Sequence, residues 1–174
     1  MTRDPYGMSR MLSFDLEGER FMYRVAGVAV IDGRVLVHQF EGEDDFYVVP
    51  GGRVEMREPA EEALAREMRE ELGCEVRIGR LLWVIDNLFW HRGHDYHELG
   101  LYFAITLPDG CQQASGEPWT GAEVVGLADG ETVEMYFQWK PVDELASLDL
   151  KPSCLREMLR ELPEHTQYVV HRDS

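Results

Sequence analysis

Three glutamates gather on a stretch of the chain that is expected to be helical. Pro59 suits the first turn of a helix and Gly73 suits the position just past its end, so the sequence predicts a helix from Glu58 to Leu72. At about 100° per residue, the acidic side chains of its second half share an arc of roughly 100°. They are Glu67, Glu70 and Glu71. Like charges three or four residues apart repel one another along a helix.

Carboxylate oxygens that converge in this way are the ligands that Mg²⁺ or Mn²⁺ prefers, and the ion would cancel the repulsion. The upstream pair Gly51-Gly52 could bring a backbone carbonyl to the same point, because glycine has no Cβ to block a close approach. The alternative is a solvated glutamate-rich face, which is common in a chain this acidic. The helix alone leaves both interpretations open.

The spacing around these glutamates resembles the Nudix box of the Nudix hydrolase family. Every fixed position of that pattern is filled within residues 52–74. The matching residues are Gly52, Glu58, Arg66, Glu67, Glu70, Glu71 and Gly73. Cys74 departs from the pattern, since the family usually has a larger aliphatic residue there. The VVPGG run before the box and the QWKPVDEL segment near the C-terminus also look like this family.

The resemblance implies a hydrolase that cleaves a pyrophosphate bond in a nucleoside diphosphate linked to another moiety (NTP, NDP or NDP-X), with Mg²⁺ or Mn²⁺ as cofactor. It implies the family's α/β/α sandwich with a mixed β-sheet, formed as one domain over residues 1–174. The expected partner is a small nucleotide substrate. The resemblance is also compatible with a homodimer, because many family members pair, although the sequence identifies no interface.

The resemblance assigns roles within the box as well. The metal ligands would be the carbonyl of Gly52, or of Gly51, and the carboxylates of Glu67, Glu70 and Glu71. Arg66 would hold a glutamate in place by a charge-assisted hydrogen bond, and Glu58 would brace the junction of loop and helix. Glu67 or Glu70 would take the proton of an attacking water. Gly51 and Gly73 would have structural roles in the backbone of the box.

The substrate class stays open from sequence. Subfamilies of Nudix hydrolases carry a proline or a tyrosine about sixteen residues beyond the box, whereas this chain has Trp90 and His91. The coenzyme A and NADH signatures are absent as well. Three charged residues outside the glutamate cluster are candidates for substrate binding, each with an ordinary surface role as the alternative. They are Arg53 directly after the glycines, Arg24 on the first strand, and Glu98 within an apolar strand where an unpaired carboxylate would be costly. Glu98 could also be an extra metal ligand or base.

Aromatic and histidine side chains give weaker signals. Four aromatic residues could stack on a base, although core packing is the commoner role. They are Phe40, Phe46, Trp90 and Trp119. A zinc site built from His91, His94 and His97 is disfavoured, because a spacing of three does not place three side chains on one face of a strand. A solvated hairpin tip is the better interpretation.

The elements that must position these residues follow from local patterns. An Asp32-Gly33 pair between two β-rich runs predicts a hairpin. The pattern predicts a short strand at 46–50 that stops at a sharp Pro-Gly-Gly turn, followed by the helix. Further strands are expected at 75–90, 97–108 and 132–139, and a closing helical region at 145–162. The Gly-rich segment 108–131 is either a functional lid or a surface loop.

Composition bounds the function. The chain has 174 residues, 44% of them hydrophobic, and 17 basic against 33 acidic residues give a net charge of −16. Such a charge excludes a general binder of nucleic acid polymers, and it disfavours docking on an anionic membrane. No signal peptide or membrane-spanning run is visible, so a cytoplasmic protein is expected. Cys74, Cys111 and Cys154 form no zinc or disulfide motif, which favours inert thiols.

Two other functions compete with the hydrolase. A Nudix-like module could sense a nucleotide without cleaving it, although degenerate boxes are the usual sign of that outcome and this box is intact. A plain acidic interaction domain would have no saturable metal site at all.

Overall fold

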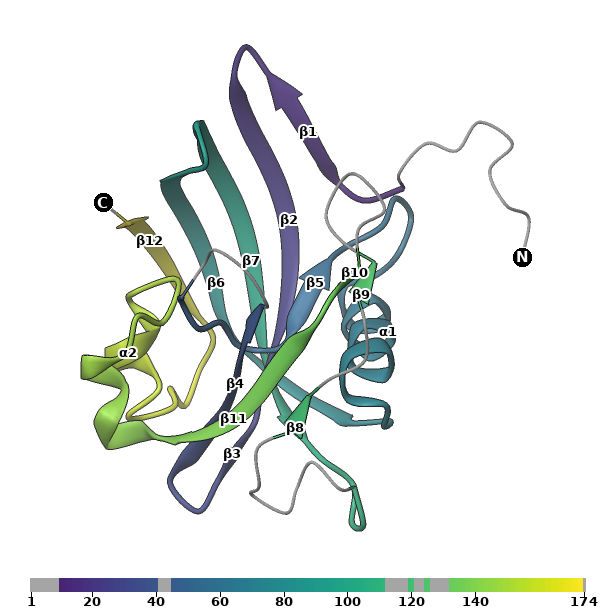
Figure 1. The fold of residues 1–174 in the computed structure, drawn as a ribbon, viewed down its shortest axis with the longest axis vertical. Coiled ribbons are helices and arrows are strands. Elements are labelled where there is room, and N and C mark those ends of the chain that lie inside the picture. Colours follow the sequence, from purple (N-terminus) through teal and green to yellow (C-terminus); the bar gives the residue numbers. More distant parts are fainter. Residues whose placement is uncertain (1–9, 41–44, 112–118, 121–123, 126–131, 174) are drawn as a thin grey trace.

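Two β-sheets form the centre of the molecule, and a helical layer lies on either side of them (Figure 1). The computed structural model describes residues 10–40, 45–111, 119–120, 124–125 and 132–173. Its elements are β1 (Ser13–Leu16), β2 (Glu19–Val28), β3 (Val30–Ile31), β4 (Arg34–Phe40), β5 (Gly51–Arg53), α1 (Ala60–Leu72), β6 (Arg77–His91), β7 (His94–Thr106), β8 (Trp119–Thr120), β9 (Val124–Val125), β10 (Thr132–Val133), β11 (Met135–Pro141), the 3₁₀ helix η2 (Val142–Ser147), α2 (Leu155–Met158) and β12 (Gln167–Asp173).

The larger sheet has the strand order β1-β2-β7-β6-β12, with β5 added beside β2. Strands β2 and β7 run parallel, as do β6 and β12, whereas the other pairs of this sheet are antiparallel. The mixed sheet expected from the sequence is therefore confirmed. Long antiparallel strands β6 and β7 meet at Arg92-Gly93, where both residues have positive φ, as a tight hairpin turn requires.

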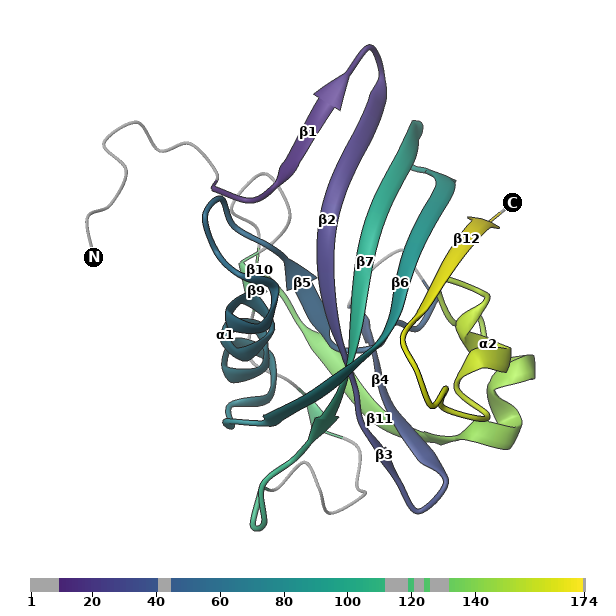
Figure 2. The ribbon, with the colours of Figure 1, turned by 180° about the vertical axis from the view of Figure 1, so that it is seen from behind.

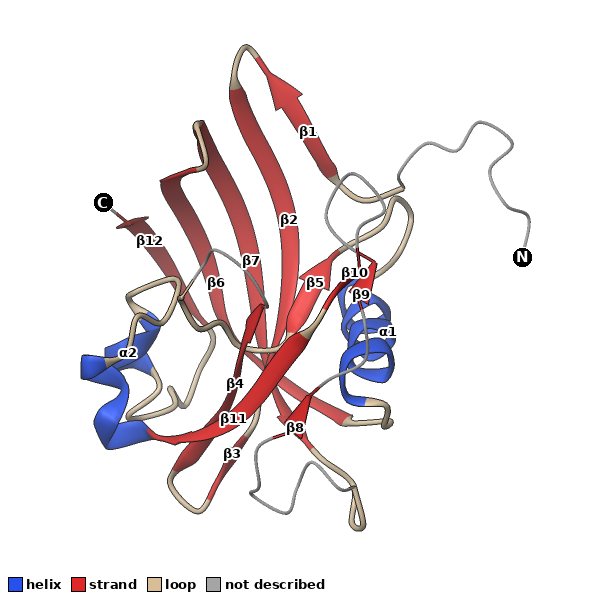
Figure 3. Ribbon diagram, in the orientation of Figure 1, coloured by secondary structure: helices blue, strands red, loops and turns tan. Residues whose placement is uncertain are grey.

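The smaller sheet has the order β3-β4-β11-β8 (Figure 3). Its first two strands are joined at Asp32 and Gly33, with φ of 48° and 71°, so the predicted hairpin is confirmed. Strands β9 and β10, which lie between β8 and β11 in the sequence, form a separate short antiparallel pair. The predicted strand at 132–139 is thus split between β10 and β11, and the segment 108–131 includes the short strands β8 and β9. Residues 112–118, 121–123 and 126–131 of that segment lie outside the described residues.

Successive residues of a strand feed two separate cores, because side chains alternate between the faces of a sheet. Val25 of β2 packs in a core with Leu64 and Met68 of α1. Its neighbour Ala26 packs in a second core with Leu155 of α2. Helical elements therefore cover opposite sides of the sheets, as the view from behind shows (Figure 2). The expected sandwich of helices around a mixed sheet is the observed arrangement.

Helix α1 ends as its sequence predicts but begins later. Gly73 adopts the left-handed conformation, with φ of 66°, and its N–H bonds the carbonyl of Arg69. The helix begins at Ala60 instead of Glu58, because extended Pro59 caps the helix and does not belong to its first turn. Among the apolar residues of α1, Leu64, Met68 and Leu72 are buried, while Ala65 is only half-buried.

Two further expectations are wrong. Residues 46–50 make only isolated bridges, and the strand is the glycine segment β5 itself, where a turn was expected. Gly51 lies there at φ 149°, and a Cβ on it would come 2.1 Å from the carbonyl oxygen of Val25. Only glycine can pair this closely with β2.

The closing helical region at 145–162 is mostly turns, with one short 3₁₀ helix and the four-residue α2, since Pro152 lacks an N–H and interrupts it. The chain then adds strand β12, parallel to β6, which was not expected. None of the helices in the described part of the chain is long and apolar enough to cross a membrane.

Candidate active site

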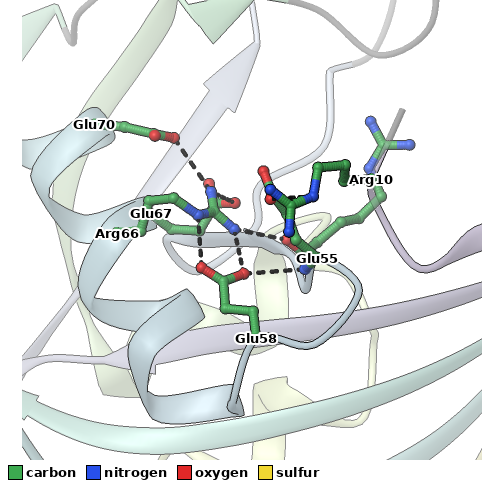
Figure 4. Close-up of polar contacts among 7 residues, drawn as sticks. Arg10, Glu55, Glu58, Arg66, Glu67 and Glu70 are labelled. Carbon is green, nitrogen blue, oxygen red and sulfur yellow. Dashed lines mark hydrogen bonds and ion pairs between the residues drawn. The ribbon is translucent and has the colours of Figure 1, made fainter. Parts of the chain in front are cut away.

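An arginine in the middle of α1 joins the preceding loop to the helix (Figure 4). Nε and Nη2 of Arg66 donate to the two carboxylate oxygens of Glu58, each at 2.9 Å. Nη2 also donates to the backbone carbonyl of Arg53 at 3.1 Å, and Glu58 accepts the backbone N–H of Glu55 at 3.0 Å. These bonds lower the pKa of Glu58, chiefly through the Arg66 guanidinium. The bracing contact proposed for Glu58 is present.

The same guanidinium reaches two more carboxylates. Nη1 of Arg66 donates to Oε1 of Glu67 at 2.6 Å, and it lies 3.4 Å from Oε2 of Glu70 (Figure 4). One positive charge is thus shared among three negative ones, counting Glu58. The cluster keeps an excess of negative charge in a partly buried place.

Glu67 lies directly over the glycine strand. A Cβ built on Gly52 would come 2.3 Å from Cδ of Glu67, so the carboxylate occupies the space that any other residue would fill. The Glu67 side chain is buried, and burial raises its pKa, against the opposing effect of Arg66. The absence of a side chain at Gly52 is therefore what lets this carboxylate reach the strand.

Glu71 lies on the same face one turn further along α1. Its Oε2 accepts the backbone N–H of Gly51 at 2.9 Å, and the residue is only 5% exposed. Burial raises the pKa of Glu71 well above its usual range, and the charge of Glu67 adds to this. Two buried carboxylates therefore destabilise each other's charged forms at the edge of β5.

Glu70 is separated from this pair by its exposure. More than half of its side chain surface is open to solvent, and its contact with Arg66 is long. Within the described ranges, no three His, Cys, Asp or Glu side chains converge closely enough to hold a metal ion as they stand. The structure thus brings Glu67 and Glu71 together at the glycine strand and leaves Glu70 at the rim.

The chemistry of this donor set fits a hard divalent cation. Two carboxylates approach a backbone that has no side chain at Gly52, and carboxylate oxygens are ligands that such a cation prefers. Burial raises the pKa values of Glu67 and Glu71 in spite of the opposing charge of Arg24. A bound dication would reverse both shifts.

A family model described as the NUDIX domain matches residues 22–162, which include the whole of this loop and helix. The chain belongs to the Nudix hydrolase family. The residues described above, which the sequence predicted to be its Nudix box, lie within the matched range.

Individual relatives match with lower coverage. The CTP pyrophosphohydrolase of Escherichia coli (strain K12) is 40% identical over 58 residues, which are 32% of this chain and 43% of that relative. The chain thus matches less than half the length of this curated relative. A UDP-X diphosphatase structure is 22% identical with a TM-score of 0.55, covering 85% of this chain and 66% of that one. An ADP-ribose pyrophosphatase structure from Streptococcus suis 89-1591 is 15% identical with a TM-score of 0.55, covering 86% and 98%. At these identities the two structures show the shared fold.

The two candidate arginines of this Nudix protein lie next to each other. Arg24 of β2 is paired with Arg53 of β5, immediately beside the pair of Val25 and Gly52. Arg24 donates to the carbonyl of Val49 at 3.0 Å. Burial lowers the pKa of Arg53, while the nearby charge of Glu67 opposes that shift. Both guanidinium groups thus belong to the neighbourhood of the box carboxylates.

Glu98 lies two residues further along the same sheet face. It is 6% exposed on β7, where it pairs with Met22 of β2 and Asn87 of β6. Burial raises its pKa, and Arg24 and a hydrogen bond from Asn87 partly offset this. The charge of Arg24 likewise lowers the pKa values of Glu67 and Glu71, so one arginine acts on all three carboxylates.

Two buried polar residues near Arg24 were not identified from the sequence. Asn87 is 4% exposed, and its Oδ1 has no hydrogen-bond partner among the described residues. Neither ring nitrogen of His38 has one within the same ranges, and burial, with Arg24 nearby, holds the pKa of His38 well below its usual value. Each interrupts an apolar strand, which is the signal that could have found them.

The aromatic and histidine candidates make other contacts or are exposed. Phe40 packs edge-on against His38, Phe46 contacts His91, and Trp90 is 67% exposed. His97 Nε2 lies 2.5 Å from Asp86 Oδ1. The side chain of Trp119 lies outside the described part of the chain.

Proposed function

We propose that this chain is a metal-dependent pyrophosphohydrolase that cleaves a pyrophosphate bond in a nucleoside diphosphate linked to another moiety. The observation that carries the proposal is the pair of buried carboxylates, Glu67 and Glu71, held at Gly51-Gly52, where burial raises the pKa of Glu71 well above its usual range. The relatives named for CTP, UDP-X and ADP-ribose support an anhydride between two phosphates as the common target.

The cation would be Mg²⁺ or Mn²⁺, held by the box. Its ligands would be the carbonyl of Gly52 and the carboxylates of Glu67, Glu70 and Glu71. When bound, the ion neutralises phosphate oxygens, polarises phosphorus and lowers the pKa of a water. Glu70 can reorient toward such a site at little cost, because exposed ion pairs contribute only about 0–1 kcal/mol.

Glu67 or Glu70 would accept the proton of the attacking water. Glu67 is buried above Gly52, so its carboxylate is held at the proposed metal site, where the attacking water would lie. Arg66 holds Oε1 of Glu67, which fixes the orientation of the whole carboxylate above Gly52. Arg66 would therefore serve catalysis by orienting the base.

The residues outside the box would bind the substrate. Arg24 and Arg53 would meet phosphate oxygens, because guanidinium groups bind them with paired hydrogen bonds. Glu98 would meet the nucleoside or the second moiety, together with the unsatisfied Oδ1 of Asn87. A strand rises about 3.3 Å per residue, so these two groups lie roughly 7 Å beyond Arg24 along the sheet.

A substrate panel tests the reaction. The protein would be incubated with Mg²⁺ or Mn²⁺ and nucleoside triphosphates, nucleoside diphosphates, nucleotide sugars, ADP-ribose, NADH or dinucleoside polyphosphates, and the products separated. We expect metal-dependent turnover of one class, reduced about 1,000-fold or more in Glu71→Gln. Glu62→Gln, an exposed change on the same helix, should leave the rate unchanged.

Two results would contradict the proposal. If Glu71→Gln is as active as the wild type, the metal site lies elsewhere. If no substrate turns over but nucleotides bind tightly in calorimetry, the chain is a nucleotide-sensing module.

A further inference from the structure

Two of the three cysteines lie in direct contact just beyond the C-terminal end of α1. Cys74 follows Gly73, the residue that ends α1, and Cys111 follows the turn after β7. The Cys111 thiol donates to Cys74 with an Sγ–Sγ distance of 2.9 Å, and both residues are reduced. That separation is about 0.9 Å longer than a disulfide bond of about 2.05 Å.

The fold itself sets this contact. Arg77 of β6 pairs with Thr106 of β7, so the segments that precede and follow these strands leave the sheet side by side. Gly73 and Gly110 both have positive φ, and they turn these two segments of the chain toward each other. The N–H of Cys111 bonds the carbonyl of Pro108 at 3.1 Å, which closes the second turn. Backbone geometry on both sides therefore places the sulfurs.

Small molecules have a route to the pair. Cys74 and Cys111 line a hollow of about 430 Å³ together with Leu72, Pro108 and Asp109. Both cysteines are half-buried rather than enclosed. The third cysteine, Cys154, packs against the other core, on the side of α2.

We propose that Cys74 and Cys111 are a modification site, a dithiol that a low-molecular-weight disulfide oxidises to an intramolecular disulfide. One thiolate attacks a sulfur of the oxidant, which forms a mixed disulfide and releases one small thiol. The second cysteine then attacks the protein sulfur of that mixed disulfide and releases the other small thiol. The Sγ–Sγ bond forms, two electrons pass to the oxidant, and the two cysteine protons end on the two small thiols.

The rate should depend on pH in a defined direction. Both steps need a thiolate. Burial, together with the neighbouring Cys111, raises the pKa of Cys74 to about 12. Oxidation should therefore be slow at neutral pH and become faster as the pH rises.

The bond would tie the end of the helix that carries the box glutamates to the end of β7. Because the sulfurs already touch, it should leave the box where it is, and the proposal does not depend on the proposed function. A cross-link between residues 74 and 111 restricts the unfolded chain, so the melting temperature should rise by roughly 5–10 °C.

Oxidised glutathione is the probe. Reduced full-length protein would be incubated with it at pH 8.5 and examined by intact mass spectrometry, peptide mapping and thermal unfolding. We expect a loss of about 2 Da, a peptide linking Cys74 to Cys111, and the higher melting temperature. Cys154→Ser should behave in the same way, whereas Cys74→Ser and Cys111→Ser should lose the link.

The proposal is overturned if the wild-type protein keeps glutathione on single cysteines, if the mapped link involves Cys154, or if the thiols of Cys74 and Cys111 stay unmodified. Peptide mapping of the wild type decides among these results even where a serine variant fails to fold.

Discussion

The cluster around Arg66 and the cluster around Ser153 both fasten a loop to a neighbouring element, but they balance charge in opposite ways. In the second cluster, the backbone N–H and the hydroxyl of Ser153 donate to Asp173 of β12, and Ser153 Oγ lies 3.0 Å from Nε2 of His171. Burial alone would raise the pKa of Asp173, but these hydrogen bonds, with His171 and Lys151, lower it below its usual value. The carboxylate is fully used in holding the fold.

At the Arg66 cluster, by contrast, not every carboxylate has a lowered pKa. Glu58 accepts from Nε and Nη2 of Arg66 and has a lowered pKa, whereas Glu67 and Glu71 are buried and have raised pKa values. One arginine would have been enough to anchor one carboxylate. The two others cost stability in the protein alone, and natural proteins keep such local conflicts chiefly at functional sites.

The largest expected effect comes from closing the space under Glu67. In Gly52→Ala, the new Cβ would lie 2.3 Å from the Glu67 carboxyl carbon and must displace it. A shift of about 1 Å in a catalytic group can cost about 100-fold, so we expect kcat/KM to fall at least that far. Steady-state kinetics on the substrate found in the panel measures this.

Gly79→Ala is the matched control, since its Cβ would come no closer than 3.1 Å to the carbonyl oxygen of Ala104. It should keep nearly full activity. Equal losses in both variants would mean that Gly52 matters for folding and that the comparison between the two clusters has no functional content.

Local signals explain why the helix and the box could be predicted. The apolar stripe, Pro59 and Gly73 all lie within α1 or next to it, so no distant contact is needed to interpret them. The helical spacing of about 100° per residue places three glutamates on one face of α1. It does not tell that Glu71 is buried and Glu70 is exposed, because that depends on where β5 lies against the helix.

Long-range pairing explains what was missed. Asn87 reaches the face of Glu98 only through the register between β6 and β7, which the sequence of either strand does not set alone. Strand β12 joins the sheet by parallel pairing with β6, far from it in the chain. The short strand β5 is missed for a different reason, since two glycines predict a turn unless a neighbouring strand pairs with them.

A smaller effect should follow from replacing Arg66 with lysine, which keeps the charge but loses the fork. Lysine cannot bind both oxygens of Glu58 and the carbonyl of Arg53 together. We expect the free energy of unfolding to fall by about 2 kcal/mol and kcat/KM to fall about tenfold, because the orientation of Glu67 is lost as well. Urea unfolding and kinetics measure the two effects.

Arg69→Lys is the control on the same helix, because Arg69 is exposed and lies 3.7 Å from Glu75. It should change neither quantity measurably. An Arg66→Lys protein with wild-type stability and rate would show that a positive charge alone, without bidentate geometry, serves the cluster.

The smallest effect is a difference in the pH dependence of stability between Glu71→Gln and Asp173→Asn. The folded-state pKa of Asp173 is lowered, so its contribution is present above the unfolded pKa of about 3.9 and is lost as the pH falls through the folded value. Asp173→Asn should therefore be less stable than the wild type by about 1 kcal/mol near pH 7, and the gap should narrow in acid.

The contribution of Glu71 to stability depends on pH in the opposite direction. Its folded-state pKa is raised, so the native protein binds the extra proton, and the wild type loses stability as the pH rises above about 4.3 toward the folded value. In chelator-treated buffer, Glu71→Gln should avoid that loss and gain on the wild type with rising pH. Urea unfolding between pH 4 and 8 measures both slopes. Slopes of the same sign in the two variants would mean that the carboxylates of α1 are balanced within the protein, and the charge argument for a bound cation would fail.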